Sequence, residues 1–491
     1  ISYLDNTDLN LIYANYDGST WTNSTVDSNG RVGKESSLAI DTEGEIHISY
    51  RDFENNKLKY VTTKASNTIY PEYISAGWHH TCAIETTGDL YCWGKNTDYQ
   101  LGDGTNTNRN SPTKVNLGEG RTASSVTTGW GHTCAIVDNG SVMCWGLNGF
   151  GRLGNGNTVT QQTPVYVLLP RAATVASIGD EASCALLDNG SVMCWGRGSL
   201  NAIGNGDTAD QNSPVYVNIP SSRTAIHISS GRQHACAVLD NGSAMCWGTG
   251  GSGRLGTGSV ADSATPQYIA INQSKGNFTK LAAAFEYTCG IRENGSVNCW
   301  GSASEGRLGN NVSVGTSLTP VLVHLPNGRK AISISGEHAH TCAILDNGSA
   351  VCWGWGGKGQ IGNGGNSNAV IPTFVNLPVG RKATSITAHA EGHSCAILDN
   401  HSAMCWGEGA DDRLGTGSTS SINVPGWVNG TRKWAINYAN IDTDGDGFFD
   451  NIDVFPNNVS EWLDTDGDGV GDNTDAFPNN ANETVDSDGD G

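Results

Sequence analysis

Short apolar stretches separated by polar and glycine-rich loops recur along most of the chain. One repeat shows the pattern in full, with SSVTTG (124–129), HTCAIV (132–137), SVMCWG (141–146) and, after a long loop, PVYV (164–167). These stretches are too short for helices and are rich in β-branched and aromatic residues, which predicts four strands per repeat. The long loop contains a glycine-rich stretch, GRLGNG at 151–156.

The two central strands of each repeat are predicted to form a hairpin. Asp-Asn-Gly at 138–140 suits a three-residue loop whose glycine takes the left-handed conformation. That register places Cys134 directly opposite Cys144. Alternate residues on both faces of the hairpin are apolar, so both faces must be covered. Four-stranded blades packed face to face around an axis provide that burial, whereas a single flat sheet does not.

The first cysteines of the hairpins set the number of repeats. They are Cys82, Cys134, Cys184, Cys236, Cys289, Cys342 and Cys395, with spacings of 52, 50, 52, 53, 53 and 53 residues. A period of this length is typical of propellers and related arrays. We therefore expect an all-β fold in which residues 70–437 form a seven-bladed β-propeller of four-stranded blades. Trp434-Ala-Ile-Asn-Tyr looks like a further copy of the strand PEYISA (71–76) and is expected to close or cap the ring.

The segment GWHHTCAIETTGDLYCWGKNTDYQLGDG (77–104) resembles the repeat of the regulator of chromosome condensation family. The resemblance covers roughly residues 70–437 and implies a seven-bladed propeller. The family's eponymous nucleotide-exchange activity depends on loops and a wedge that have no match in this sequence. A secreted inhibitor of β-lactamases is similar in fold, so an extracellular use of the scaffold is consistent with the resemblance.

Every repeat has two cysteines in opposed positions, and three interpretations compete. A zinc site would have only two sulfurs per blade and lacks a C-x-x-C motif, while buried free thiols are the simplest alternative. Opposed positions in all seven repeats favour disulfides, each contributing roughly 2–3 kcal/mol, in a protein outside the reducing cytosol. The expected pairs are Cys82–Cys92, Cys134–Cys144, Cys184–Cys194, Cys236–Cys246, Cys289–Cys299, Cys342–Cys352 and Cys395–Cys405.

Sequons and histidines also recur. The sequons at Asn139, Asn189, Asn241, Asn294 and Asn347 lie in the hairpin turn, where Asn-Gly is favoured for structural reasons. The off-turn sequons are the better glycosylation candidates, and these are Asn23, Asn277, Asn311 and Asn429. A histidine precedes the first cysteine in five repeats (His80, His132, His234, His340 and His393). Equivalent positions on separate blades form a ring rather than a cluster, so a structural role is favoured over catalysis and no catalytic residues are assigned.

Residues 441–491 are expected to be a separate calcium-binding segment. They hold thirteen Asp, two Glu and no Lys or Arg, and so carry most of the formal net charge of −21. DTDGDG occurs at 442 and 464, and DSDGDG at 486, a period of 22 residues. The spacing matches calcium loops with carboxylates at positions 1, 3, 5, 9 and 12 and a carbonyl at position 7.

The predicted calcium ligands are Asp442, Asp444, Asp446, Phe448, Asp450, Asp453, Asp464, Asp466, Asp468, Val470, Asp472, Asp475, Asp486, Asp488 and Asp490. Prolines after each complete loop argue against an EF-hand. The segment resembles thrombospondin type 3 repeats, with Phe-Pro where that family usually has Cys-Pro. The alternative is an acidic disordered tail.

Residues 1–66 contain a different repeat. ISYLDNTDLNLIY at the start aligns with ISYRDFENNKLKY at 48–60, and this predicts the end of another propeller-type β-repeat array. The chain opens and stops within patterns, so we expect it to be an internal piece of a longer polypeptide. No apolar run approaches the roughly 20 residues of a membrane span, and without a basic patch nucleic acid is not an expected partner.

Together these features predict a non-enzymatic, extracellular or cell-surface protein with an adhesion or scaffold role. The propeller would bind a protein, a glycan or other copies of the chain, on a stalk stiffened by Ca2+. The alternatives are a structural subunit of a surface layer or filament, a secreted protein-binding inhibitor, and an enzyme whose site lies in the array upstream.

Overall fold

A computed structural model describes residues 71–270, 276–389 and 392–429, Ser460, and six N-terminal strands as backbone only. Those six strands form two antiparallel three-stranded sheets, β1-β2-β3 and β4-β5-β6. Their bounds are β1 (Ser2–Leu4), β2 (Leu11–Tyr16), β3 (Trp21–Asp27), β4 (Val32–Ile40), β5 (Ile46–Asp52) and β6 (Lys57–Thr62). That these sheets end a second propeller-type array in residues 1–66 stays a prediction.

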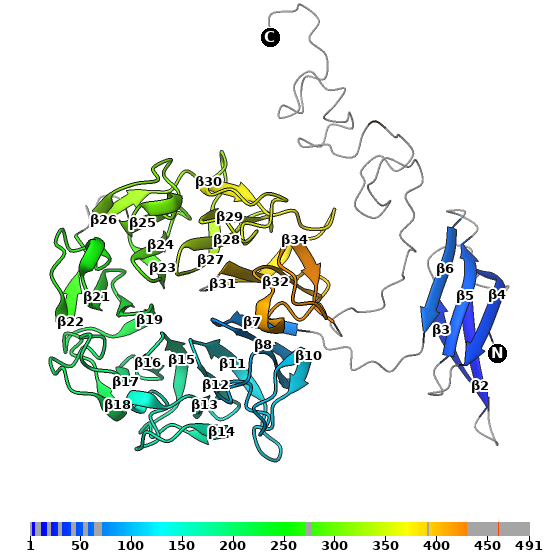
Figure 1. Cartoon of the computed structure of the whole chain (residues 1–491), viewed down its shortest axis with the longest axis horizontal. Helices are drawn as coiled ribbons and strands as arrows, with labels where there is room; N and C mark the ends of the chain where they lie inside the picture. The colour runs from blue at the N-terminus through cyan, green and yellow to red at the C-terminus, as the bar shows by residue number, and fades with distance from the viewer. Residues whose placement is uncertain are drawn as a thin grey trace, which may run out of the picture. The chain divides into compact units, whose positions relative to one another are not determined.

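The remaining strands form a ring of seven four-stranded antiparallel sheets (Figure 1), which confirms the predicted all-β seven-bladed propeller. The first strands are β7 (Pro71–Ala76), β11 (Ala123–Thr128), β15 (Ala173–Ile178), β19 (Ala225–Ser230), β23 (Phe278–Ala283), β27 (Ala331–Glu337) and β31 (Ala383–His389). The second strands are β8 (His80–Glu85), β12 (His132–Val137), β16 (Ala182–Leu187), β20 (His234–Leu239), β24 (Tyr287–Arg292), β28 (His340–Leu345) and β32 (His393–Leu398).

The third strands are β9 (Leu90–Gly94), β13 (Val142–Gly146), β17 (Val192–Gly196), β21 (Ala244–Gly248), β25 (Val297–Ser302), β29 (Ala350–Gly354) and β33 (Ala403–Gly407). The fourth are β10 (Arg109–Lys114), β14 (Gln161–Tyr166), β18 (Gln211–Tyr216), β22 (Ser263–Tyr268), β26 (Thr316–Leu322), β30 (Ala369–Phe374) and β34 (Ile422–Trp427). Short 3-10 turns in the glycine-rich loops are η1 (Gly149–Gly151), η2 (Gly251–Gly253), η4 (Ser304–Gly306) and η6 (Ala410–Asp412).

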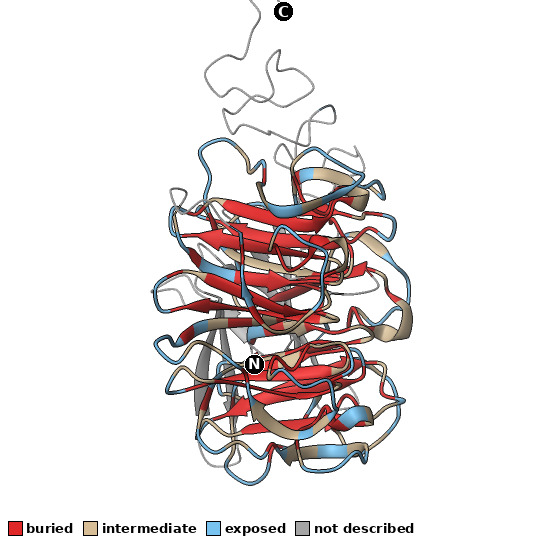
Figure 2. Ribbon diagram, turned by 90° about the vertical axis from the view of Figure 1, so that its left-hand side faces the viewer, coloured by how far each residue is buried: buried red, intermediate tan, exposed pale blue. Residues whose placement is uncertain are grey.

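Each blade is built from one contiguous stretch of chain, running from its first strand at the axis to its fourth at the outer wall. The second and third strands are buried along their whole length because neighbouring blades cover both faces (Figure 2). Their hairpin has the predicted register, with Cys134 opposite Cys144. Gly140 closes the predicted three-residue turn with φ of 78°.

A tryptophan fixes each blade to the one before it. Seven equivalent indoles are fully buried, and each donates its N–H to a backbone carbonyl in the glycine-rich loop of the preceding blade. For example, Trp195 donates to the carbonyl of Arg152 at 2.8 Å. The loop glycine that follows must lie against the same ring. A Cβ on Gly154, whose φ is 66°, would come within 2.8 Å of the Trp195 indole nitrogen.

Histidines join the same blades at a second level. His80 Nε2 bonds to Thr133 Oγ1 of the next blade at 2.8 Å. Four further pairs repeat this bond, namely His132–Ser183, His234–Thr288, His340–Ser394 and His393–Thr81. The two repeats that lack the histidine compensate for its loss. Where Ala182 replaces the histidine, the equivalent hydroxyl residue of the next blade is replaced by Ala235, so no buried hydroxyl loses its partner. Where Tyr287 replaces it, the tyrosine hydroxyl bonds to Thr341 Oγ1 of the next blade at 2.8 Å.

Closure of the ring uses the same contacts between the seventh and first blades. The Trp93 indole donates to the carbonyl of Arg413 at 3.1 Å. Thr387 Oγ1 accepts a hydrogen bond from the backbone N–H of Ala76 at 3.2 Å. Ile74 and Val428 lie in one apolar cluster with Trp93. Trp434, the start of the predicted closing strand, lies outside the described residues.

Candidate functional site

The predicted cysteine pairs are brought together in all seven blades. Cys82–Cys92, Cys134–Cys144, Cys184–Cys194, Cys236–Cys246, Cys289–Cys299, Cys342–Cys352 and Cys395–Cys405 are disulfide-bonded, with Cα atoms 4.0–4.1 Å apart. They lie within the apolar layers between blades, and all fourteen are essentially inaccessible to solvent. Their role is therefore to hold the blade core rather than to present a reactive thiol.

The turn sequons have a structural use. Asn139 Oδ1 accepts a hydrogen bond from the backbone N–H of Ser141 at 3.0 Å, and the turns of the following repeats do the same. Among the off-turn sequons, Asn277, Asn311 and Asn429 are exposed. The side chain of Asn23 lies outside the part of the chain that the structure describes. The prediction that the off-turn sequons are glycosylated rested on the predicted extracellular location.

The predicted calcium ligands between Asp442 and Asp490 lie outside the described residues, and calcium binding by them stays a prediction. Within residues 71–270, 276–389 and 392–429, no group of three or more His, Cys, Asp or Glu is arranged to hold a metal ion. No helix in those ranges is long and apolar enough to cross a membrane.

The repeat breaks down at one position, the tip of the loop between the first and second strands of each blade. The residue at this tip in blades one to six is Trp78, Trp130, Asp180, Arg232, Phe285 and His338. We call these six residues the axial cluster, because they meet over the axis of the ring. The ring centroids of Trp78 in the first blade and His338 in the sixth are 6.3 Å apart. The guanidinium of Arg232 in the fourth blade lies 5.7 Å from the centroid of the Trp78 ring.

Such contacts between non-neighbouring blades are possible only across the axis, so the axial cluster closes one end of the central channel. The Phe285 and His338 rings stack with centroids 5.3 Å apart. The Arg232 guanidinium lies 4.5 Å from the Phe285 centroid, and its Nε donates to Asp180 at 2.8 Å. Cation–π contacts and the ion pair therefore hold Arg232 in place.

Buried arginines from the glycine-rich loops position three of the tips. Arg152 donates to the carbonyl of Asp180 at 2.9 Å, Arg254 to that of Phe285 at 2.8 Å, and Arg413 to that of Trp78 at 3.0 Å. Each arginine belongs to the blade before the tip that it holds. The tips are therefore fixed by the scaffold, as a preorganised binding surface requires.

Two carboxyl groups share the positive charge of Arg232. Burial raises the pKa of Asp180 to about 7, against the lowering effect of Arg232. Burial, followed by the neighbouring Asp180, raises the pKa of Glu337 well above its ordinary value. Both carboxyl groups therefore hold a proton more readily than a free Asp or Glu.

Around the axial cluster the loops present further large side chains. Trp130 is 39% exposed and Phe150 is 38% exposed, and Arg197 lies 4.9 Å over the Phe150 ring. We call this side of the ring, formed by the axial cluster and the glycine-rich loops, the loop face. Tryptophan and arginine are the residues most enriched in the energetically dominant positions of protein interfaces.

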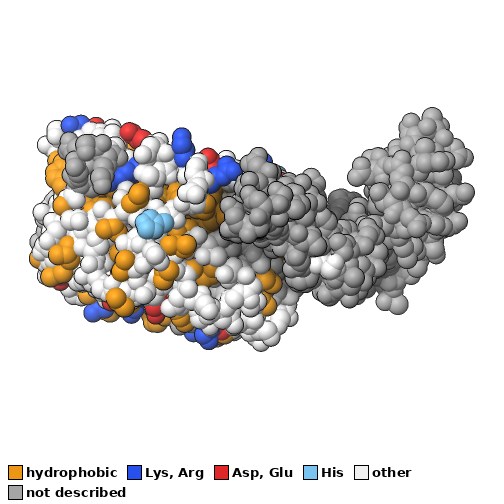
Figure 3. All heavy atoms as spheres, turned by 90° about the horizontal axis from the view of Figure 1, so that it is seen from above, with side chains coloured by type: hydrophobic (Ala, Val, Ile, Leu, Met, Phe, Trp, Pro, Cys, Tyr) orange, Lys and Arg blue, Asp and Glu red, His pale blue; other side chains and the backbone are white. Residues whose placement is uncertain are grey.

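The outer wall differs from the loop face. Figure 3 views the ring edge-on and shows hydrophobic side chains interspersed with uncharged ones, while charged groups gather toward the two faces. The exposed residues Tyr166, Tyr216 and Tyr268 occupy the same position at the end of successive fourth strands. They follow the repeat, whereas the tips of the loop face do not.

Sequence models of the regulator of chromosome condensation (RCC1) repeat match this chain. One matches residues 87–136, 139–186, 189–238, 294–344 and 347–397, and a second matches 73–100, 123–152, 174–201, 225–254 and 330–360. The ultraviolet-B receptor UVR8 of Arabidopsis thaliana is 29% identical over 356 residues, which cover 72% of this chain and 80% of UVR8.

Two further relatives are covered by this chain to very different extents. The E3 ubiquitin-protein ligase HERC2 of Mus musculus is 26% identical over 378 residues, 74% of this chain but only 7% of HERC2. The crystal structure of Prp20p from Saccharomyces cerevisiae, studied for its binding to Gsp1p and histones, covers 74% of this chain and 88% of Prp20p. Its TM-score is 0.62 at 21% identity, which shows a common fold.

These comparisons correct the predicted location and role. The relatives are intracellular regulators, not secreted or adhesive proteins. The extracellular or cell-surface location and the adhesion or scaffold function are therefore wrong, and so are the two extracellular alternatives, while the upstream enzyme fits no better. The error has a physical cause: opposed, fully buried cysteines report the geometry of a hairpin and fit an apolar core, so they do not by themselves report the compartment.

Proposed function

Since the chain belongs to the family of proteins built from RCC1 repeats, we propose that its propeller is the protein-binding module of a regulatory protein. The loop face is the part that contacts the partner. The observation that carries this proposal is the axial cluster, where the repeat-equivalent position holds Trp, Trp, Asp, Arg, Phe and His in six successive blades. A purely structural position would keep one residue type, as the blade-interface tryptophans do.

The arrangement supports binding better than catalysis. Asp180 and Glu337 are only 6% and 7% exposed, and a substrate approaching from the loop face would meet Arg232 and Phe285 before their carboxyl groups. By contrast, Trp130 and Phe150 project from fixed loops and are free to enter a partner's surface. We therefore propose that this propeller acts by binding a partner and not by catalysing a reaction.

The binding of Prp20p to Gsp1p and histones suggests the kind of partner to test first. Histones are basic, and the loops of this face carry Glu181, Glu286, Glu305 and Asp411, each in an ion pair with an arginine. The lysine and arginine side chains of a basic protein would gain favourable attraction at short range by sharing these carboxylates. This attraction, together with insertion of Trp130 and Phe150, makes a basic protein the preferred partner class.

Photocrosslinking from two matched phenylalanines tests the assignment of the face. p-Benzoylphenylalanine is placed at Phe150 on the loop face or at Phe374 on the outer wall, which is 50% exposed. We expect irradiation of cells that express the chain to give protein adducts from position 150 and not from position 374. Adducts from position 374 alone would assign the contact to the outer wall and overturn the proposal.

Affinity measurements extend the test. Purified core histones and Gsp1p are titrated onto the wild-type chain, Trp130→Ala and the outer-wall variant Tyr216→Ala. We expect Trp130→Ala to weaken the binding of any retained ligand at least tenfold, and Tyr216→Ala to change it less than twofold. Equal weakening by both substitutions would contradict a contact through the loop face.

A further inference from the structure

The seven first strands enclose a channel along the axis, with a cavity volume of about 280 Å3. This is just below the about 300–1,000 Å3 that is usual for small-molecule sites. One end lies beneath the axial cluster. At the other end Tyr73 is 42% exposed beside His227, so the channel opens toward the hairpin-turn side of the ring.

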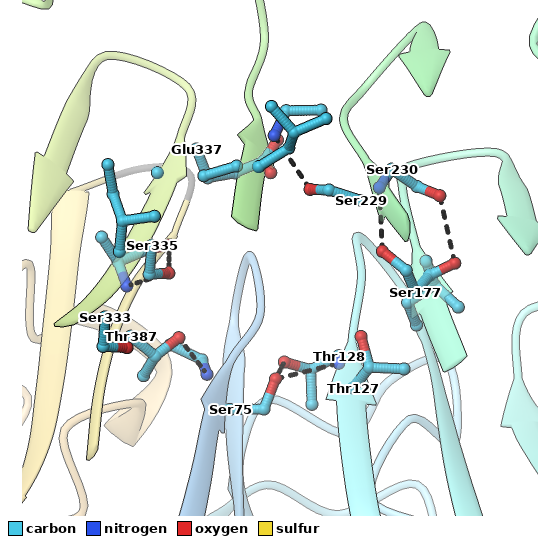
Figure 4. A pocket seen from close by; sticks show the side chains of 18 of the residues that line it. Ser75, Thr127, Thr128, Ser177, Ser229, Ser230, Ser333, Ser335, Glu337 and Thr387 are labelled. Carbon is cyan, nitrogen blue, oxygen red and sulfur yellow. Dashed lines mark hydrogen bonds between the residues drawn. The ribbon is translucent and has the colours of Figure 1, made fainter. Parts of the chain in front are cut away.

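Hydroxyl groups line the middle of the channel, as Figure 4 shows for Ser75, Ser177, Ser335 and Thr387. Several accept a hydrogen bond from a backbone N–H of the next blade, for example Ser177 from Ser230 at 2.8 Å and Ser335 from Ala388 at 3.0 Å. A hydroxyl oxygen has two lone pairs. One lone pair therefore stays available for a donor inside the channel.

The side chain of Glu337 lines the channel at the closed end. Glu337 is the only Asp, Glu, Lys or Arg among the described residues that line the channel. The repeat-equivalent positions are small, with Gly77, Gly129, Gly179, Gly231 and Ala284 in the first five blades. The glutamate therefore adds a carboxyl group at a place where the fold itself needs no side chain.

Arg232 acts on the Glu337 carboxylate only from a distance, because its ion pair is with Asp180. Glu337 is 7% exposed, and its side chain is in no ion pair within the described residues, because Arg232 pairs with Asp180. Burial, followed by the nearby Asp180, raises its pKa well above the ordinary value, and the backbone N–H of His338 and the charge of Arg232 offset this only in part. A buried carboxylate is costly unless a proton or a cation meets it, so a cation that enters the channel would stabilise the ionised form of Glu337.

The chemistry of the channel selects among cations. Calcium and magnesium need several oxygen ligands with high negative charge, whereas Glu337 is the one carboxylate among the described residues that line the channel. A guanidinium is planar and best matched by a bidentate acceptor with stacking, whereas an ammonium group is a compact charge with three donors on a flexible apolar stem. Apolar side chains such as Ile74, Ile228 and Leu281 alternate with the hydroxyls and would contact that stem.

We propose that the axial channel binds the ammonium group of a primary aliphatic amine, which enters from the open end and places its nitrogen against the Glu337 carboxylate. The source is either a free alkyl amine or a lysine side chain. This site lies within the ring, beneath the axial cluster, and does not depend on partner binding by the loop face.

Calorimetric titration of the full chain tests the proposal with defined probes. The probes are 1,6-diaminohexane, its uncharged analogue 1,6-hexanediol, and a lysine-containing peptide. We expect the diamine to bind at one site at least tenfold more tightly than the diol. Binding of the diamine alone identifies a free amine as the source, and tighter binding of the peptide identifies a protein lysine. Equal affinities for diamine and diol would overturn the proposal.

Variants separate the channel from general attraction to an acidic chain. Glu337→Gln keeps the shape of the side chain and is expected to weaken diamine binding at least tenfold. The matched control Glu286→Gln, outside the channel, should change it less than twofold. Ala282→Leu fills the channel while keeping the Glu337 charge, and should also abolish binding. Unchanged affinity in both Glu337→Gln and Ala282→Leu, with thermal unfolding like the wild type, would place the amine elsewhere.

Discussion

The blade interface and the axial cluster lie only two residues apart in each repeat, yet they vary in opposite ways. At the interface a change in one residue is matched in its partner: Ala182 faces Ala235, and Tyr287 reaches Thr341. At the tips the residues change from blade to blade without any such rule, and they contact one another across the axis. Positions that must fit a neighbouring copy keep the repeat, while positions released from that demand are available for recognition.

Removal of an interface indole should have the largest effect. Trp195→Ala deletes a fully buried ring and its bond to the Arg152 carbonyl, and we expect a loss of about 3–5 kcal/mol in the free energy of unfolding. Trp130→Ala, at the tip, should cost only about 0.5–1.5 kcal/mol. Urea titration followed by circular dichroism measures both, and equal losses would erase the distinction between the two regions.

The disulfide layer should come next. Replacing Cys134 and Cys144 together by alanine frees a ten-residue loop in the unfolded chain, which should lower the unfolding free energy by about 2–3 kcal/mol. The same double replacement of Cys236 and Cys246 serves as the comparison, since both pairs occupy the same position in their blades. Unchanged stability in both double variants would mean that the cysteines act only as packed apolar groups.

The pairing rule at the interface is testable by a double-mutant cycle. His340→Ala removes the bond to Ser394 and should cost about 1–3 kcal/mol, because it leaves a buried hydroxyl with one partner fewer. Adding Ser394→Ala recreates the Ala182–Ala235 arrangement. We expect a coupling energy of about 0.5–1.5 kcal/mol between the two substitutions, measured by urea titration. Strict additivity would show that the natural Ala–Ala interface is not a compensated pair.

The smallest effect should be the pH dependence contributed by the axial cluster. Asp180 has a folded-state pKa near 7, above its unfolded value, so the folded chain holds the extra proton between about pH 4 and 7. Its contribution to stability is therefore lost as pH rises from about 4 to about 7. Melting temperatures across this pH range should change with a more negative slope in the wild type than in Asp180→Asn.

Buried histidines titrate with the opposite sign and are present in both proteins. Burial lowers the pKa of His80 and His340 to about 3. Their contribution to the stability of the fold is therefore lost only as pH falls below the unfolded pKa near 6.5. Because the histidine contribution is common to both proteins, the difference in slope between the two melting curves reports Asp180. Parallel curves would contradict its raised pKa.

The sequence predicts the propeller well because its evidence is local. Spacing of the cysteines gives the number of blades, and Asp-Asn-Gly gives the hairpin register that opposes Cys134 and Cys144. The blade histidines were expected to be structural, although their hydroxyl partners in the next blade were not identified. Those partners follow the first-strand tip by three residues in every repeat and could have been found by comparing neighbouring copies.

The axial cluster could not be predicted in the same way. Trp78 and Arg232 are separated by three blades, and only the closure of the ring brings them within 6 Å. The one signal in the sequence is an absence of repetition: two residues before the recurring histidine, the residue type changes from blade to blade. Glu337 gives the same signal one residue earlier, where the other blades have glycine or alanine.

Because every blade is one contiguous stretch and the ring closes through side chains and hydrogen bonds, the order in which the blades are synthesised is not built into the fold. Ile74 and Val428, near the two ends of the ring, share one apolar cluster. A circularly permuted chain with those ends linked, and new termini between the second and third blades, would keep every strand pairing. Whole blades are thus interchangeable units of inheritance, and a gene could gain a new loop tip by recombination at a blade boundary without redesigning the ring.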